Sequence, residues 1–376
     1  MFRHIVTLLL ILTQVTALAE PSDSLRRGGL WNGIKNYLRL DADTAADQHK
    51  RFSISVLGGP SYASDSKFGL GLAGVAHYRL NGCEDIQPSN ATITGSITTA
   101  GFWKLGIEGT TFFPDDRMRI NYEMNVEYAP RDFWGIGYEH GNIDDYHTQL
   151  HEHHYKVKGE LLFRLANDLY AGPMLQWDYA SSGKVDKVEL FEGQDQVVRN
   201  YGVGLTLQYD SRDLVTNAFS GVYLYLNQVF RPRFLWNHYA FSTTEFEGCY
   251  YHKAWRDAVI AGQVTALFNL GNPSWAMMAL MGDSHSMRGY YHGRYRDKHM
   301  VTAQVELRQY VYRRFGFVVW GGAGSVFHDS DSFRNWLPNY GLGLRWEFRR
   351  RVNVRLDYGF GKRGQSGFMF NINEAF

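Results

Sequence analysis

The sequence predicts an all-β protein, a transmembrane antiparallel β-barrel of about sixteen strands. Three observations support this fold class. The chain opens with the pattern of an export signal, many of its segments alternate polar and apolar residues, and its last expected strand ends in the aromatic Phe376, which we interpret as a C-terminal barrel signal. Together they indicate the outer membrane of a Gram-negative bacterium.

Residues 1–19 have the pattern of a cleavable signal peptide. Arg3 supplies a basic start, residues 5–15 form an apolar stretch, and Ala17-Leu18-Ala19 provides small residues for cleavage. The apolar stretch is shorter than the roughly 20 residues of a membrane-spanning helix. Residues 20–50 form a short leader whose apolar residues are spaced like one face of a helix, and either an interfacial leader or a helix inside the barrel fits them.

Alternation is the main secondary-structure signal. From Met118 to Tyr128, apolar residues alternate without interruption with Arg, Asn and Glu. A strand points successive side chains to opposite faces, so one face of this segment is apolar and the other is polar. A soluble sandwich also alternates, but its strands usually have about five or six residues, whereas a tilted membrane strand needs about 9–11. The length favours the barrel.

Strands placed between turn signals number about sixteen and fill residues 51–376. Long connections then fall at one rim, at 129–153, 180–198 and 269–298, and short turns fall at the other, as in outer-membrane barrels with long extracellular loops. The expected strands are 52–60, 68–80, 91–100, 102–113, 118–128, 154–165, 168–179, 199–210, 220–230, 239–250, 258–268, 299–311, 315–324, 339–348, 352–360 and 366–376.

The composition limits the classes of function. The chain has 39 Lys and Arg against 38 Asp and Glu, so its net charge does not indicate a nucleic-acid partner. Cys83 and Cys249 fall on separate parts of a wide barrel, and we expect no disulfide between them. We expect neither a metal nor a cofactor, because the histidines in and beside one long connection lack the spacing of metal ligands. These histidines are His147, His151, His153 and His154. We expect no catalysis, because no nucleophile stands in a catalytic context.

The connection before the twelfth strand carries the most specific motif. It contains Met287-Arg288-Gly289-Tyr290, and the strand Gln304-Val305-Glu306-Leu307-Arg308 follows. An apolar residue, Arg, Gly and an aromatic residue at this place in a sixteen-stranded barrel resemble the signature of the BamA-type superfamily, also called bacterial surface antigens. The resemblance runs from about residue 50 onward, and we expect a member without the periplasmic POTRA domains.

The resemblance implies that the sixth long loop folds into the lumen and that its arginine pairs with a carboxylate there. Arg288 would be that arginine, with Gly289 allowing a tight turn and Tyr290 packing the loop tip. Family members usually supply the carboxylate from an Asp on the thirteenth strand, where this chain has Gly322. The candidate partners are therefore other lumen-facing carboxylates, namely Glu306, Glu347 and Asp357.

Two further segments are similar to the family. The segment 209–213 resembles its periplasmic turn motif, in which Asp210, Arg212 and Asp213 are the characteristic residues. The last two expected strands, ending at Phe376, resemble its C-terminal strands. These matches extend the resemblance over most of the chain.

The resemblance implies a non-enzymatic role in the insertion or translocation of proteins, or of lipids, at the outer membrane. The expected partners are outer-membrane lipid, client proteins and periplasmic or lipoprotein subunits. A passive pore or a small-solute transporter is the alternative. Family members act through a weak seam between the first and last strands. Gly58, Gly59 and Pro60 would shorten this seam, although they also suit an ordinary strand end.

Overall fold

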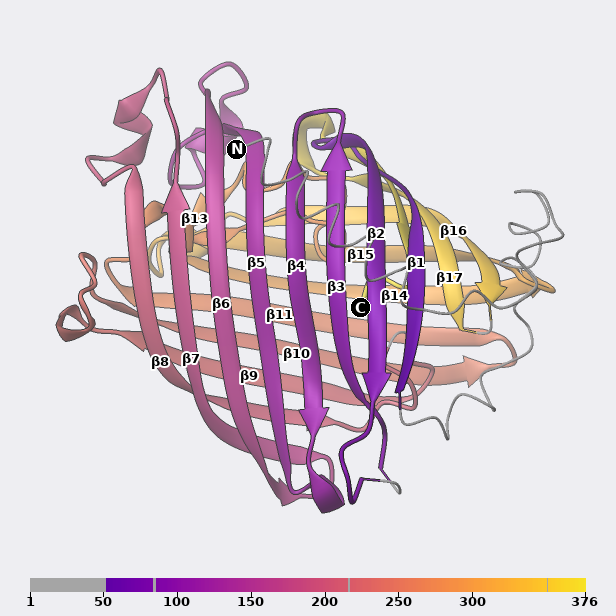
Figure 1. Cartoon of the computed structure of the whole chain (residues 1–376). Coiled ribbons are helices and arrows are strands. Elements are labelled where there is room, and N and C mark those ends of the chain that lie inside the picture. Colours follow the sequence, from indigo (N-terminus) through magenta and orange to yellow (C-terminus); the bar gives the residue numbers. More distant parts are fainter. Residues whose placement is uncertain (1–51, 84–85, 216, 350) are drawn as a thin grey trace, which may run out of the picture. The chain divides into compact units, whose positions relative to one another are not determined.

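A computed structural model describes residues 52–83, 86–215, 217–349 and 351–376, which form a closed antiparallel β-barrel (Figure 1). The predicted signal peptide and leader, residues 1–50, lie outside the described residues. Within the described ranges, no helix is long and apolar enough to cross a membrane.

Sixteen of the strands in the described residues form the barrel wall, in the number and order that the alternation predicts. Each pairs with its neighbours, and β1 and β18 close the barrel. The wall strands are β1(Phe52–Ala63), β2(Lys67–Tyr78), β3(Ser89–Thr98), β4(Trp103–Phe112), β5(Met118–Phe133), β6(Thr148–Ala166), β7(Leu169–Ser181), β8(Val197–Asp210), β9(Gly221–Arg231), β10(Phe241–Trp255), β11(Ala258–Gly271), β14(His299–Tyr312), β15(Phe315–Phe327), β16(Leu337–Arg349), β17(Val352–Phe360) and β18(Ser366–Ile372).

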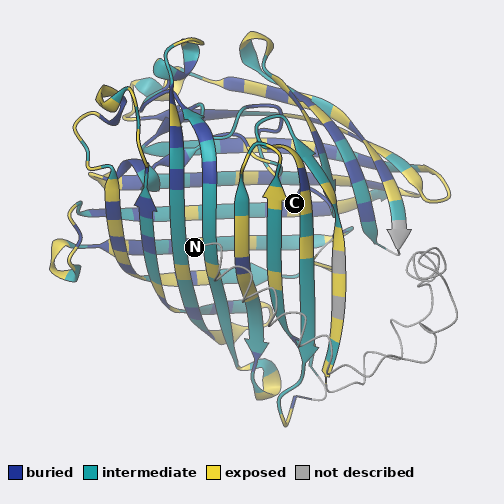
Figure 2. Ribbon diagram, turned by 45° about the horizontal axis from the view of Figure 1, so that its top comes forward, coloured by how far each residue is buried: buried dark blue, intermediate teal, exposed yellow. Residues whose placement is uncertain are grey.

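The barrel wall is apolar outside and largely polar inside. On β14, Val305 is exposed on the outer face, whereas its neighbours Gln304 and Glu306 are buried in the interior. Figure 2 shows buried and exposed residues alternating along many wall strands. Strand pairing satisfies the backbone polar groups, and the apolar outer face suits contact with hydrocarbon.

The two rims of the barrel differ as predicted. At the short-turn rim, two-residue turns join β6 to β7, β10 to β11, β14 to β15 and β16 to β17. Asp168, Asp257, Arg313 and Arg351 have positive φ in these turns, as tight hairpins often require. At the long-loop rim, the connections 134–147, 182–196 and 272–298 are much longer.

The connection between β11 and β14, residues 272–298, is called loop 6 here. Two short strands of loop 6, β12(Ala279–Leu280) and β13(Arg296–Asp297), pair with each other. Trp275 of loop 6 is fully buried with Phe133 and Phe191 in one apolar cluster. Tyr290 and Tyr295 of loop 6 belong to a second cluster. Loop side chains therefore pack together into two cores at the long-loop end of the barrel.

Several strand ends differ from the predicted ones. β1 continues past Pro60 to Ala63, because Pro60 still pairs with Leu70 of β2. β5 and β6 run further toward the long-loop rim than the alternation indicated, so the connection between them shrinks to residues 134–147.

The last strand is shorter than predicted and does not include Phe376. β18 ends at Ile372, and Asn373 has a φ of 69°, which turns the chain away from the strand direction. The next residues, Glu374 and Ala375, are buried. Strand pairing was expected to continue through this segment. Instead, Glu374 forms ion pairs with two arginines in the lumen.

The absence of a disulfide is confirmed, since Cys83, in the connection between β2 and β3, and Cys249, on β10, are both buried thiols. We predict that neither thiol of the folded barrel reacts with a bulky water-soluble maleimide, because reagent of that size cannot reach a buried sulfur. Gel shifts measured before and after full denaturation check this, with two shifts expected after denaturation. A shift of the folded barrel, or a faster-migrating oxidised form, would contradict the prediction.

Candidate functional site in the barrel lumen

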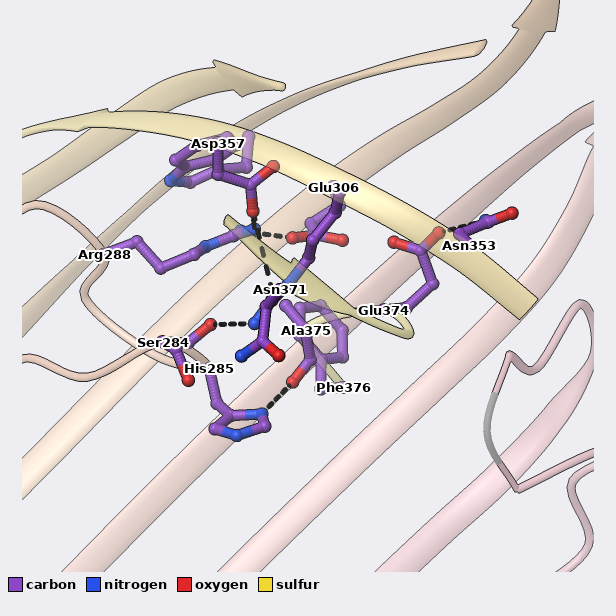
Figure 3. A network of polar contacts seen from close by, with 12 residues as sticks. Ser284, His285, Arg288, Glu306, Asn353, Asp357, Asn371, Glu374, Ala375 and Phe376 are labelled. Atoms are coloured by element: carbon purple, nitrogen blue, oxygen red, sulfur yellow. Dashed lines mark hydrogen bonds and ion pairs between the residues drawn. The ribbon is translucent and has the colours of Figure 1, made fainter. Parts of the chain in front are cut away.

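Arg288 of loop 6 lies in the barrel interior with its side chain fully buried. Its Nη1 donates a hydrogen bond to Oδ2 of Asp357 on β17 at 2.8 Å, and its Nη2 donates to Oε1 of Glu306 on β14 (Figure 3). The guanidinium also lies over the ring of Trp320, 3.7 Å from the ring centroid. Two carboxylates and an aromatic face supply the pairing that a buried guanidinium requires.

The structure brings two of the three candidate carboxylates to Arg288 and leaves Glu347 elsewhere. Glu347 accepts a hydrogen bond from the backbone N–H of Arg351, 2.6 Å away, near the short-turn rim. Asp357 pairs across the sheet with Gly343, so Glu347 is four residues closer to that rim. At about 3.3 Å per residue this offset is roughly 13 Å, too far for an ion pair.

Gly322 explains why the partner carboxylates come from β14 and β17 and not from β15. A side chain on Gly322 would place its Cβ 2.3 Å from the carbonyl oxygen of Ala303, so an Asp does not fit without a shift of backbone. Gly322 pairs with Gln304, whose amide donates to Oε1 of Gln263 at 2.6 Å and to the carbonyl of His285 at 2.7 Å. Through its hydrogen bond to His285, Gln304 connects loop 6 to the wall directly opposite Gly322, the position where family members usually have Asp.

Two glycines allow the loop tip to touch the wall. Gly289 has a φ of 103°, and a Cβ there would lie 2.6 Å from the backbone of Gly359 on β17. Tyr290 follows, and its hydroxyl donates to the carbonyl of Pro338 at 2.6 Å and accepts from the N–H of Lys362 at 2.7 Å. Burial raises the pKa of the Tyr290 phenol, so the hydroxyl stays protonated and can donate.

A second arginine ties loop 6 to the connection between β5 and β6. The Nε of Arg294 donates to the carbonyl of Gly141 at 2.8 Å, and its Nη2 pairs with the carboxylate of Asp144. This hydrogen bond from Arg294 lowers the pKa of Asp144, which therefore stays ionised at neutral pH. Two long loops of the same rim are thus joined.

Three residues around Arg288 were not predicted. The indole N–H of Trp320 donates to Oδ1 of Asn339 at 3.0 Å, and the amide of Asn339 in turn donates to the backbone carbonyl of Arg288. Arg345 donates to Oδ1 of Asp357 at 2.5 Å. Alternation places all three side chains on the inner face of β15 or β16, but no spacing in the sequence connects them to residue 288.

The predicted periplasmic turn residues form a separate cluster at the short-turn rim. The guanidinium of Arg212 makes two hydrogen bonds to the carboxylate of Asp210, at 2.9 and 2.7 Å, and lies over the ring of Tyr223. The carboxylate of Asp213 accepts from the N–H of Phe219 at 2.9 Å and from Arg351 at 2.6 Å. These contacts hold the β8–β9 turn against the β16–β17 turn.

A sixteen-stranded barrel with a loop arginine paired in its lumen defines the class of protein, an outer-membrane β-barrel. The sequence profile of the Omp85 superfamily domain matches residues 102–376. The chain belongs to the Omp85 superfamily, as the BamA-type motif predicted, and to the outer membrane of a Gram-negative bacterium.

Solved structures show the same fold. BamA from Haemophilus ducreyi lacking POTRA domains 1–3 is 13% identical, with a TM-score of 0.59 over 85% of this chain and 69% of that chain. CdiB from Acinetobacter baumannii is 10% identical, with a TM-score of 0.55 over 86% of this chain and 60% of that chain. CdiB from Escherichia coli is 12% identical, with a TM-score of 0.54 and coverage of 85% and 62%. The chain thus spans about 60% of either CdiB structure. No curated protein sequence matches it.

We predict that Arg288→Gln lowers the free energy of unfolding by about 3–5 kcal/mol, because it leaves two buried carboxylates without their shared cation. Urea unfolding in detergent micelles measures this change. The control is Arg256→Gln, since the side chain of Arg256 is 95% exposed and its loss should cost less than about 0.5 kcal/mol. Equal effects of the two substitutions would show that the pairing of Arg288 contributes no stability.

We predict that Gly289→Ala destabilises the contact between loop 6 and β17 by about 1–3 kcal/mol, because the substitution adds both a strained φ and a clash with Gly359. Gly321→Ala is the matched control, since a Cβ at Gly321 meets nothing within 4 Å. Limited proteolysis of the folded barrel checks the prediction, with faster cleavage in residues 284–297 expected for Gly289→Ala alone. Unchanged cleavage would mean that the loop tip tolerates a side chain.

Proposed function

We propose that this barrel acts without catalysis in the insertion or translocation of proteins, or of lipids, at the outer membrane. The seam between β1 and β18 is where the incoming chain engages. Outer-membrane lipid, client proteins and periplasmic or lipoprotein subunits are its partners. Membership of the Omp85 superfamily supports this proposal, together with the resemblance of Arg288-Gly289-Tyr290 to the BamA-type loop motif.

The narrow seam is the observation that carries the proposal. Among the described residues, β1 and β18 are in register at two pairs, Tyr62 with Phe370 and Ala63 with Met369. On its other side, β1 is in register with β2 over twelve pairs, and β18 is in register with β17 over seven. A strand edge with little registered pairing can accept an added strand through main-chain hydrogen bonds.

Two features of the lumen bear on the choice between a transporter and insertion at the seam. A polar cavity of about 520 Å³ lies in the lumen among β3 to β9, with Asn121, Lys158 and Glu160 in its wall. Such a wet space would suit a small-solute transporter, the alternative function. The buried clusters that contain Trp275 and Tyr290 fill space at the long-loop end, and this packing favours engagement at the seam over free passage through the barrel.

We predict that a disulfide across the seam blocks insertion. The seam variant carries Tyr62→Cys with Phe370→Cys, and the matched control carries Tyr62→Cys with Phe68→Cys, which lie opposite each other on β1 and β2. Each protein is reconstituted in liposomes, and the folding rate of an added unfolded outer-membrane barrel polypeptide is measured by its gel mobility. The oxidised seam variant should lose the acceleration given by the native chain, and reductant should restore it.

The control separates seam opening from general damage. The oxidised Tyr62–Phe68 variant should accelerate folding as the native chain does, because its cross-link joins strands that stay paired. Acceleration by the oxidised seam variant would contradict the proposal. So would a large, steady planar-bilayer conductance that the seam cross-link leaves unchanged, since that result supports the pore.

A further inference from the structure

Six charged residues form a closed ring in the barrel lumen, called the lumenal ring here. Its members alternate in charge, and each contacts the next: Arg288, Glu306, Arg308, Glu374, Arg345 and Asp357. The separations include 2.9 Å from Glu306 to Arg308 and 2.8 Å from Glu374 to Arg345. The longest contact, from Arg308 to Glu374, is 3.9 Å. The ring thus holds three arginines and three carboxylates, and a fourth buried arginine, Arg355, lies beside it, 3.6 Å from Asp357.

One member of the lumenal ring comes from beyond the last wall strand. Glu374 belongs to residues 373–376, called the tail here, which follows β18. The backbone N–H of Asn373 donates to the carbonyl of Asn353 at 2.7 Å, and the side-chain amide of Asn353 donates to Oε1 of Glu374 at 2.5 Å. These contacts with β17 direct Glu374 into the lumen, where it meets Arg308 and Arg345.

The rest of the tail also lies against the inner wall and loop 6. The ring nitrogen Nδ1 of His285 lies 2.5 Å from the carbonyl of Ala375 (Figure 3). Arg308 donates to the backbone oxygen of Phe376 at 2.9 Å and lies over its ring, which also contacts Tyr251. The tail and loop 6 thus share both a direct contact and the lumenal ring.

The inward position of the tail excludes a second position along the seam. Tyr62 is in register with Phe370, so an uninterrupted β18 would place Glu374 opposite Gly58 and Phe376 opposite Val56 of β1. The turn at Asn373 instead takes the tail out of the wall. The same four residues can either lie in the lumen or extend β18 along β1, but not both.

We propose that Glu374 is a positioning residue that couples the tail to loop 6 through the lumenal ring. With Glu374 in the ring, the tail stays inside and the registered pairing of the seam stops at Tyr62. When the ring opens, the tail is released from its buried place in the lumen, and loop 6 loosens with it. Arg288 and Glu374 do not touch each other, so the coupling passes through Arg345 with Asp357 and through Arg308 with Glu306.

Charge balance is the physical reason for the coupling. Removing Glu374 leaves Arg288, Arg308, Arg345 and the neighbouring Arg355 sharing two buried carboxylates, and an uncompensated buried charge is strongly unfavourable. Removing Arg288 leaves Glu306 and Asp357 without the cation that they share. Because linkage is reciprocal, release of the tail weakens the docking of loop 6 by the same free energy by which release of loop 6 weakens the docking of the tail.

Hydrogen exchange of the full chain in detergent micelles tests the coupling, with peptides from residues 281–297 reporting on loop 6 and from 366–376 reporting on the tail. We expect Glu374→Gln and Arg288→Gln each to speed exchange about tenfold in both segments, because either one opens the ring. The double variant should exchange no faster than either single variant, since a broken ring cannot be broken again. Glu374→Asp, which keeps the charge, should restore most of the protection.

Glu347→Gln is the matched control, because Glu347 is also a glutamate of the wall but contacts Arg351 and no member of the lumenal ring. It should leave both segments as in the native chain. The proposal is overturned if Glu374→Gln speeds exchange in the tail alone, if the two single effects multiply in the double variant, or if Glu347→Gln has the same effect.

A labelling experiment covers the case in which Glu374→Gln weakens the whole barrel. Ala375→Cys places a thiol at a site that is 1% exposed. Its maleimide labelling should accelerate about tenfold with Glu374→Gln, while an Ala129→Cys thiol on β5, at a site that is 0% exposed, stays protected. Equal acceleration at both sites would mean general unfolding and would overturn the proposal. Neither experiment uses a client protein. Each result is therefore independent of whether the proposed insertion activity is correct.

Discussion

The interior of this barrel depends on the burial of one guanidinium. Arg288 comes from a long loop, yet it lies fully buried between Glu306 and Asp357, with Trp320 beneath it. A buried charge is tolerated only when its partners are complete, so the loop has to reach a fixed place on the wall. The close approach of Gly289 to Gly359 and the hydrogen bonds of Tyr290 follow from that requirement.

The wall and the interior obey opposite demands. In hydrocarbon, every backbone polar group needs a partner, which favours a fully paired barrel without an edge. At the seam, the tail turns inward and does not pair with β1, while Glu374 joins a cluster of buried charges. The tail can satisfy only one of these demands, and in this structure it forms the ion pairs.

Much of the wall was predictable because alternation is a local property. Consecutive residues of a strand point to opposite faces, so a short stretch of sequence is enough to identify each strand. The sixteen strands, their order and the unequal rims follow from such stretches. The exceptions are instructive. Pro60 was read as a strand end, but on a weakly paired edge its missing N–H costs little and β1 continues to Ala63. The predicted end of β18 was wrong because Glu374 forms ion pairs with Arg308 and Arg345, which are distant in the sequence.

The sequence alone determined the fold class, the strand order, the family motif at Arg288 and a short set of carboxylates that could face it. Tertiary structure alone decided that Glu306 and Asp357 are the partners, that Glu347 lies too near the short-turn rim, and that Gln304 occupies the space beside Gly322. It alone brought Arg308, Arg345 and Glu374 into one ring with them. The reason is physical: alternation fixes which face a side chain takes, but ion pairs depend on strand register and height along the wall, which only the closed barrel sets.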